Sequence, residues 1–180
     1  MRQEPAEPHF NLVDRAKSGD DAAFSDLIAP LIEPGRRLAL GMLHAPDAAE
    51  DAVQEACLLA WRKLHTFRAG AELRPWFFGI VANQCRSIRR TRWWSVATLA
   101  EPPYQIPAPE DAAIVGADLR RELRRLGHRD LLAVALFYYL DLPLEEVATI
   151  CRATPAATRK RLARAAHRLR PRLTVKEVTS

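Results

Sequence analysis

Cationic and small side chains alternate along the last helix that the sequence predicts, within residues 154–173. Its inward positions are Thr158, Leu162, Ala165 and Leu169, spaced i, i+4, i+7 and i+11. The outward positions are Ala156, Arg159, Lys160, Ala163, Arg164 and His167. Short side chains let a helix approach the DNA major groove closely, and Arg and Lys then reach base edges or phosphates. The pattern indicates either a DNA-reading helix or a solvated basic face.

The residues before this helix favour DNA binding. A short apolar segment, 144–151, is followed by Arg152-Ala153 and then by Thr154, a good N-cap residue with Pro155 directly after it. A helix, a tight turn and a second helix rich in Arg together describe a helix-turn-helix motif.

A second helix with an unusual outer face is predicted at residues 47–64. Its inward stripe is Val53, Ala56, Cys57, Ala60, Trp61 and Leu64. Its outer face carries Asp47, Asp51, Gln54 and Leu58, flanked by Glu50 and Glu55. Acidic residues in a first turn complement the helix dipole, which explains Asp47 and Glu50. The remaining polar residues and the exposed leucine predict a partner helix.

The segment 67–94 interleaves aromatic and basic residues, the combination that holds melted nucleic acid. A helix is predicted to start at Pro75, with its inward positions at Phe77, Ile80, Val81 and Ile88. Trp76 and Phe77 are assigned to core packing. Phe67 precedes this helix and is expected to be freer, and Asn83 is a polar residue within an apolar stretch.

Groups for covalent chemistry are scarce. The five histidines are scattered, and no HExxH, GxSxG or phosphate-binding glycine loop occurs. The three cysteines form no CxxC pair, which favours a reduced setting without a disulfide framework. We therefore expect no catalytic residue, metal or cofactor. With neither a signal-peptide pattern nor a long apolar run, the sequence predicts a soluble, cytoplasmic protein without membrane insertion.

Composition predicts an all-α protein of two small helical domains. The 180 residues include only 7 Gly, and runs of β-branched residues are scarce. The net charge is +5, with acidic residues concentrated before residue 60 and basic residues in 62–94 and 159–172. Within the first domain, breaks are expected at 19–21, 34–35, 45–47 and 67–75.

A proline-rich stretch separates the two predicted domains. Four of the 13 prolines lie within residues 102–109, where helical periodicity is lost. We assign residues 11–94 to the first domain, 95–111 to a linker and 112–173 to the second domain. A surface loop inside a single domain is the alternative.

Three stretches resemble the extracytoplasmic-function (ECF) group of bacterial RNA polymerase sigma factors. They are DAVQEACLLAWRKL (51–64), FRAGAELRPWFFGIVANQCRSIRR (67–90) and LEEVATICRATPAATRKRLARAAHRL (144–169). The resemblance covers nearly the whole chain and implies sigma region 2 at 11–94 and sigma region 4 at 112–173. Core RNA polymerase and promoter DNA are then the partners, and no covalent chemistry is performed. An anti-sigma factor is a common partner in this family and would occupy the same polymerase-facing surfaces.

The resemblance also implies roles for individual residues. Four residues match the family positions that bind the clamp helices of the large polymerase subunit: Asp51, Gln54, Glu55 and Leu58. Phe67 and Asn83 match positions near a base flipped out of the minus-10 element. The arginines that would neutralise nearby phosphates are Arg86, Arg89, Arg90 and Arg92. The positions implied to contact the minus-35 element are Thr154, Ala156, Arg159, Lys160, Ala163 and Arg164.

The sequence departs from the family pattern at several positions. Arg152 stands in the helix-turn-helix turn where glycine is usual, and a positive φ there would strain an arginine. Gly79 stands where a basic residue is common. Two alternatives to the sigma-factor hypothesis remain: a free-standing helix-turn-helix regulator, and a helical adaptor whose basic faces are merely solvated.

Overall fold

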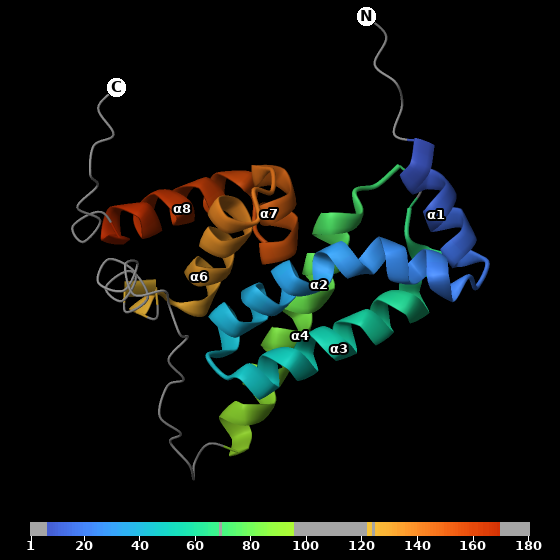
Figure 1. The fold of residues 1–180 in the computed structure, drawn as a ribbon. Coiled ribbons are helices and arrows are strands. Elements are labelled where there is room, and N and C mark those ends of the chain that lie inside the picture. Colours follow the sequence, from blue (N-terminus) through green and yellow to red (C-terminus); the bar gives the residue numbers. More distant parts are fainter. Residues whose placement is uncertain (1–6, 69, 96–121, 124, 170–180) are drawn as a thin grey trace, which may run out of the picture. The chain divides into compact units, whose positions relative to one another are not determined.

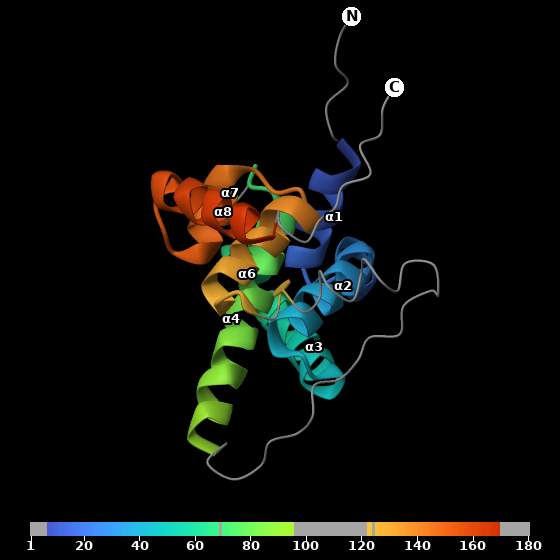
Figure 2. The same cartoon turned by 90° about the vertical axis from the view of Figure 1, so that its left-hand side faces the viewer.

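The computed structural model describes residues 7–68, 70–95, 122–123 and 125–169 (Figures 1 and 2). Every regular element in these ranges is helical, which confirms the predicted all-α class. The chain divides into two compact units, residues 1–100 and 101–180. Beyond Ser95, the predicted linker 95–111 lies outside the described residues, and its role stays a prediction.

The first unit is a bundle of four α-helices. It contains α1 (Glu7–Lys17), α2 (Asp21–Leu43), α3 (Pro46–Lys63), the 3-10 turn η1 (Leu64–Thr66) and α4 (Leu73–Ser95). α2 packs against the other three helices, and α3 also packs against α4. In both views the last turns of α4 extend past α2 and α3 (Figures 1 and 2).

The predicted break at residues 34–35 is wrong, because α2 runs unbroken through both Pro30 and Pro34. A proline inside a helix removes a hydrogen bond and crowds the preceding turn. Packing explains the continuity: a Cβ on the buried Gly35 would lie 3.4 Å from the Phe77 ring and 3.6 Å from Val81. The missing side chain therefore lets α2 approach α4 closely, and this contact favours a continuous helix over the local break.

α4 begins at Leu73, two residues before the predicted start at Pro75. Proline is tolerated in a first turn, where the amide has no intrahelical acceptor. The predicted core residues Phe77 and Val81 are fully buried, as are Phe78, Ala82 and Cys85 beside them. This continuous buried face holds α4 against α2 and α3.

The second unit contains α6 (His128–Val134), the π-helical turn η3 (Ala135–Tyr139), α7 (Leu144–Cys151) and α8 (Pro155–Leu169). Residues 122, 123 and 125 are also helical. α8 packs against both α6 and α7. The predicted inward stripe of α8 is confirmed, since all four of its residues are buried: Thr158, Leu162, Ala165 and Leu169.

The turn between α7 and α8 contains the backbone strain that the sequence pointed to. Arg152 has φ 53° and ψ 51°, the left-handed conformation that glycine adopts readily. Its amide donates to the carbonyls of Ala148 and Thr149, so this conformation closes the end of α7.

We expect Arg152→Gly to raise the free energy of unfolding by about 1 kcal/mol, because glycine removes the steric cost of a positive φ. Urea unfolding of the full chain, followed by circular dichroism, measures the change. Arg152→Ala is the control, since it removes the guanidinium but keeps the Cβ. A gain from alanine equal to that from glycine would attribute the effect to the side chain instead of the backbone.

Candidate interaction surfaces

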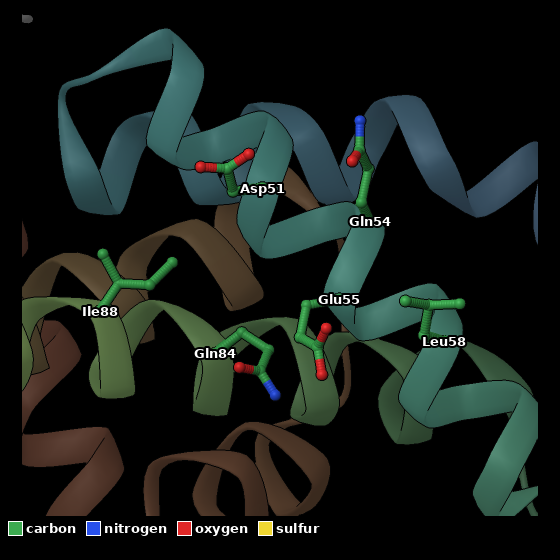
Figure 3. A pocket seen from close by; sticks show the side chains of 6 residues that line it. All are labelled: Asp51, Gln54, Glu55, Leu58, Gln84 and Ile88. Atoms are coloured by element: carbon green, nitrogen blue, oxygen red, sulfur yellow. The ribbon is translucent and has the colours of Figure 1, made fainter.

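A groove between α3 and α4 brings together the residues predicted to face a partner. Its α3 side consists of Asp51, Gln54, Glu55 and Leu58, and its α4 side of Gln84 and Ile88 (Figure 3). We call these six residues the α3–α4 groove. Leu58 is 52% exposed, a large value for an apolar side chain. The groove thus offers an apolar contact bordered by carboxylates and amides.

The local sequence explains why α3 presents this face. Four alanines on its other side, Ala49, Ala52, Ala56 and Ala60, are 1% exposed or less. Such small side chains allow α3 to pack closely against α2 and α4. The opposite face of α3 is left exposed. The Gln54 amide lies 3.5 Å from the Glu50 carboxylate, too far for a strong hydrogen bond. The groove-facing side chains are therefore available to a partner.

Sequence reasoning missed the α4 half of the groove. Gln84 received no role, and Ile88 was expected inside, whereas Ile88 is half-buried at the groove. The two residues are spaced i, i+4 and so share one helical face. This spacing could have predicted that Gln84 and Ile88 share one face of α4. Only the packing of α4 against α3 shows that this face lines the groove together with Glu55.

The exposed side of α4 holds the polar residues predicted to meet the minus-10 strand. Asn83 is exposed, and its side-chain oxygen accepts a hydrogen bond from Arg86 at 2.7 Å. Arg90 is exposed as well, and the side chain of Arg92 lies outside the described residues. Arg89 instead donates to the Met42 carbonyl at 3.0 Å. Because Met42 lies in the last turn of α2, Arg89 caps that helix end.

The expectation that Phe67 is free is wrong, because its side chain is only 5% exposed. Its ring lies against Trp76, with 5.1 Å between centroids, in a tilted arrangement typical of packed aromatic pairs. A ring stacked on a nucleic-acid base must be accessible, so this conformation does not offer Phe67 for stacking.

α8 presents the cationic surface that its periodicity predicts. All six residues predicted to face outward are exposed: Ala156, Arg159, Lys160, Ala163, Arg164 and His167. Arg161 points elsewhere, forming a 3.0 Å ion pair with Asp130 in which both side chains are less than one quarter exposed. At the start of the helix the Thr154 hydroxyl accepts from the Ala157 amide at 3.2 Å, which confirms the predicted N-cap.

The thiols of the first unit do not provide a nucleophile. Burial raises the pKa of Cys85 to about 12, and burial, with the nearby Glu50 charge, also raises the pKa of Cys57. Both are protonated at neutral pH and hence poorly reactive. Within the described ranges no group of His, Cys, Asp and Glu could hold a metal ion. None of the helices described there has the length and apolar character needed to cross a bilayer.

Known proteins similar to this chain point to one family. The Sigma-70 region 2 family matches residues 19–95, which include α2, α3 and α4. The RNA polymerase sigma factor NccH of Alcaligenes xylosoxydans xylosoxydans is 28% identical, with 88% of this chain and 90% of that protein covered. The ECF RNA polymerase sigma factor SigM of Mycobacterium tuberculosis is 29% identical, with 84% and 78% covered. These similarities support the ECF group of sigma factors as the family of this chain.

Solved structures with a similar fold agree with this family. The sigma factor RpoE of Bartonella quintana, solved with the anti-sigma factor NepR, matches with a TM-score of 0.76 and 25% identity, covering 85% of this chain and 98% of that one. CnrH, solved with the cytosolic domain of CnrY, has a TM-score of 0.71 at 21% identity and supports the fold, with 92% and 96% covered. The predicted family is confirmed, and with it a role in transcription initiation instead of enzymatic catalysis.

The second unit contains a buried polar atom on α8, the hydroxyl of Thr158, whose contribution to stability can be tested by substitution. The Thr158 hydroxyl is fully buried and has no hydrogen-bond partner within the part of the chain that the structure describes. We expect Thr158→Val to raise the free energy of unfolding by about 1 kcal/mol, since an isosteric methyl removes an unsatisfied group. Urea unfolding measures the change. A loss of stability would mean that the hydroxyl has a partner, such as an ordered water.

Proposed function

We propose that this sigma factor binds core RNA polymerase through the α3–α4 groove, opens and reads the minus-10 element with α4, and reads the minus-35 element with α8. The groove supports the first step most directly. An exposed leucine framed by Asp51, Gln54 and Glu55 is complementary to a helix that carries apolar and basic residues. The clamp helices of the large polymerase subunit are the partner that the family assignment suggests.

For the minus-10 element, we assign the exposed polar side of α4 to the melted strand. Asn83 offers amide groups for a base edge, and the adjacent Arg86 and Arg90 provide cations for phosphates. Arg89 contributes less in this proposal, because its guanidinium already binds the carbonyl end of α2. Capture of an extruded base would offset part of the cost of unstacking it.

For the minus-35 element, we assign the exposed face of α8 to the major groove. Ala156 and Ala163 allow close approach there, while Arg159, Lys160 and Arg164 reach outward. The Thr154 hydroxyl satisfies the Ala157 amide and leaves the first turn of α8 well formed.

Regulation by an anti-sigma factor fits the same groove. One matched solved structure pairs a sigma factor with the anti-sigma factor NepR, and another pairs CnrH with the cytosolic domain of CnrY. We infer that a partner of this class competes with core polymerase for the groove between α3 and α4. The site of action is then the cytoplasm, where the polymerase works.

Run-off transcription with purified core polymerase tests the whole proposal. The sigma factor should direct initiation at defined start sites, whereas core polymerase alone should not. A free-standing helix-turn-helix regulator would bind its DNA sites without core polymerase and would direct no initiation. A helical adaptor with solvated basic faces would show no promoter selectivity at any salt concentration.

Asn83→Ala should reduce open-complex formation at a duplex promoter by about tenfold, and by less at a promoter whose minus-10 region is already mismatched. Opening the duplex costs free energy, and Asn83 is expected to offset part of this cost by binding the melted strand. Mismatches lower the cost beforehand, so the loss of Asn83 should matter less on the mismatched template. Fluorescence of a base analogue in the minus-10 element measures opening on the two templates. Equal losses on both would place Asn83 in a step after melting.

A further inference from the structure

The buried part of α4 ends before the helix itself does. Its fully buried residues all lie in the first half of the helix: Phe77, Phe78, Val81, Ala82 and Cys85. Among the side chains described beyond Cys85, at residues 86–91, none is buried. Core packing therefore holds α4 firmly only as far as Cys85. Because turns with few buried contacts open more readily than a helix centre, the turns after Cys85 need another support.

Arg89 supplies such a support. It lies four residues after Cys85 and therefore on the same face of α4. Arg89 is exposed, yet its guanidinium donates at 3.0 Å to the carbonyl of Met42, which lies in the last turn of α2 and 47 residues earlier in the chain. If α2 continued, this carbonyl would accept from the amide of residue 46, but Pro46 has no amide hydrogen. Arg89 thus gives an orphaned carbonyl a charged donor and ties α4 to the end of α2.

Arg90 follows directly after this tie and faces another direction. Successive residues of an α-helix point about 100° apart around its axis. Because the Arg89 guanidinium is directed at α2, the side chain of Arg90 is turned away from that contact, and it is exposed. The two neighbouring arginines therefore have different surroundings. The direction in which Arg90 points depends on where α4 is held at Arg89.

We propose that Arg89 is a positioning residue for binding of the melted minus-10 strand. It holds the end of α4 so that Arg90 meets a phosphate, and it does not bind the strand itself. This inference rests on the proposed function, which assigns the exposed side of α4 to that strand. A loosened helix end would spread Arg90 over many positions, and ordering it again on binding would cost affinity. Asn83 does not depend on Arg89, because the buried residues Val81, Ala82 and Cys85 hold its part of the helix.

A double-mutant cycle between Arg89 and Arg90 tests this role. The measured quantity is the rate of open-complex formation at a duplex promoter, followed by a fluorescent base analogue in the minus-10 element, with core polymerase saturated by the sigma factor. Arg89→Met should lower this rate about fivefold in the wild-type background. In the Arg90→Met background it should lower the rate by less than about twofold, because the side chain that Arg89 positions is then missing. Two independent phosphate contacts would instead give the same loss in both backgrounds.

A second cycle, between Arg89 and Asn83, supplies the comparison. The losses caused by Arg89→Met and Asn83→Ala should be additive, since core packing holds Asn83 independently of Arg89. Arg89→Lys keeps a charged donor for the Met42 carbonyl and should keep the rate within about twofold of the wild-type value. Arg62→Met is the matched control and should leave the rate unchanged, because it removes the same charge from an exposed position in the last turn of α3.

Hydrogen exchange separates positioning from a general loss of stability. In Arg89→Met, amides of residues 86–91 should exchange faster than in the wild type, whereas amides of residues 77–85 should keep their wild-type rates. Should Arg89→Met fail to fold, Arg89→Ala replaces it in both cycles, since alanine is the residue most favourable to a helix.

The inference alone is overturned if Arg89→Met lowers the rate equally in the presence and absence of Arg90, or does not lower it. An equal loss in Arg62→Met would also overturn it, because net charge and not position would then be responsible. Coupling to Asn83 as strong as that to Arg90 would make Arg89 a general support of α4 and overturn its specific role. If neither Asn83→Ala nor Arg90→Met alters opening, α4 does not meet the melted strand, and the proposed function fails together with this inference.

Discussion

The double variant Gln54→Ala/Leu58→Ala should bind core RNA polymerase about 30-fold more weakly than the wild type, because it removes the apolar centre of the α3–α4 groove together with a neighbouring amide. Central interface residues in a small patch commonly carry most of the binding energy, and a loss of about 2 kcal/mol corresponds to this factor. Fluorescence anisotropy of labelled sigma factor titrated with core polymerase measures the dissociation constant.

Folding should be almost unaffected in this variant. Both side chains are exposed on α3, and alanine is the residue most favourable to a helix. The melting temperature should therefore stay within about 3 °C of the wild-type value. A comparable loss of thermal stability would contradict the prediction, since the two residues would then be structural.

Ile32→Ala provides the matched control for this double variant. Ile32 is 41% exposed on α2, similar to Leu58, but it does not line the groove. Loss of an exposed apolar side chain there should leave polymerase binding unchanged. If Ile32→Ala weakens binding as much as the double variant, the interface is not confined to the groove.

Helical periodicity predicted much of this architecture from sequence, because a buried stripe at 3.6-residue spacing also determines which residues remain outside. The inward sets of α3 and α8 were predicted on this basis, and Ala56, Thr158 and Leu162 are buried as expected. Cys57 and Trp61 of the predicted α3 set are only half-buried. The exposed α3 residues followed as the complement of the stripe.

The remaining features depend on contacts between segments that are distant in sequence. Pro34 and Gly35 carry a local signal for a break, yet close packing against Phe77 outweighs it. Phe67 lies in a loop, but the loop folds back and buries its ring against Trp76. No periodicity indicates that Arg89 reaches the carbonyl end of α2. Such contacts follow from how the helices pack, which a single sequence does not specify.

Base reading and phosphate binding by α8 can be distinguished by their different effects on specificity. Arg159→Ala or Lys160→Ala should relax the preference at one or two minus-35 positions, since a base-edge contact contributes about 1–3 kcal/mol against the wrong base. Arg164→Ala or Arg168→Ala should instead weaken all sequences alike and reduce the salt slope by roughly one unit. Affinities of the holoenzyme for a panel of single-base variants, at two salt concentrations, separate the two patterns.

Arg161 supplies an internal comparison on the same helix. Its guanidinium pairs with Asp130 of α6 at 3.0 Å, so it is directed toward the core of the unit and not toward the exposed face. Arg161→Met should therefore reduce stability and weaken binding to every sequence, without changing which bases are preferred. Stability of the Arg159 and Lys160 variants should stay near the wild-type value, because both side chains are exposed.

The rotation of α8 about its own axis decides the outcome of these measurements. The buried residues Thr158, Leu162 and Ala165 place Arg159 and Lys160 outward and Arg161 inward. If Arg159→Ala and Lys160→Ala retain the full wild-type preferences, the outward face does not read bases. If Arg161→Met alone alters the preferences, α8 must rotate on binding DNA and break the pair with Asp130. Retained preferences in all three variants would leave α8 as a phosphate-binding helix only, and minus-35 selection would have to arise from the shape of the DNA.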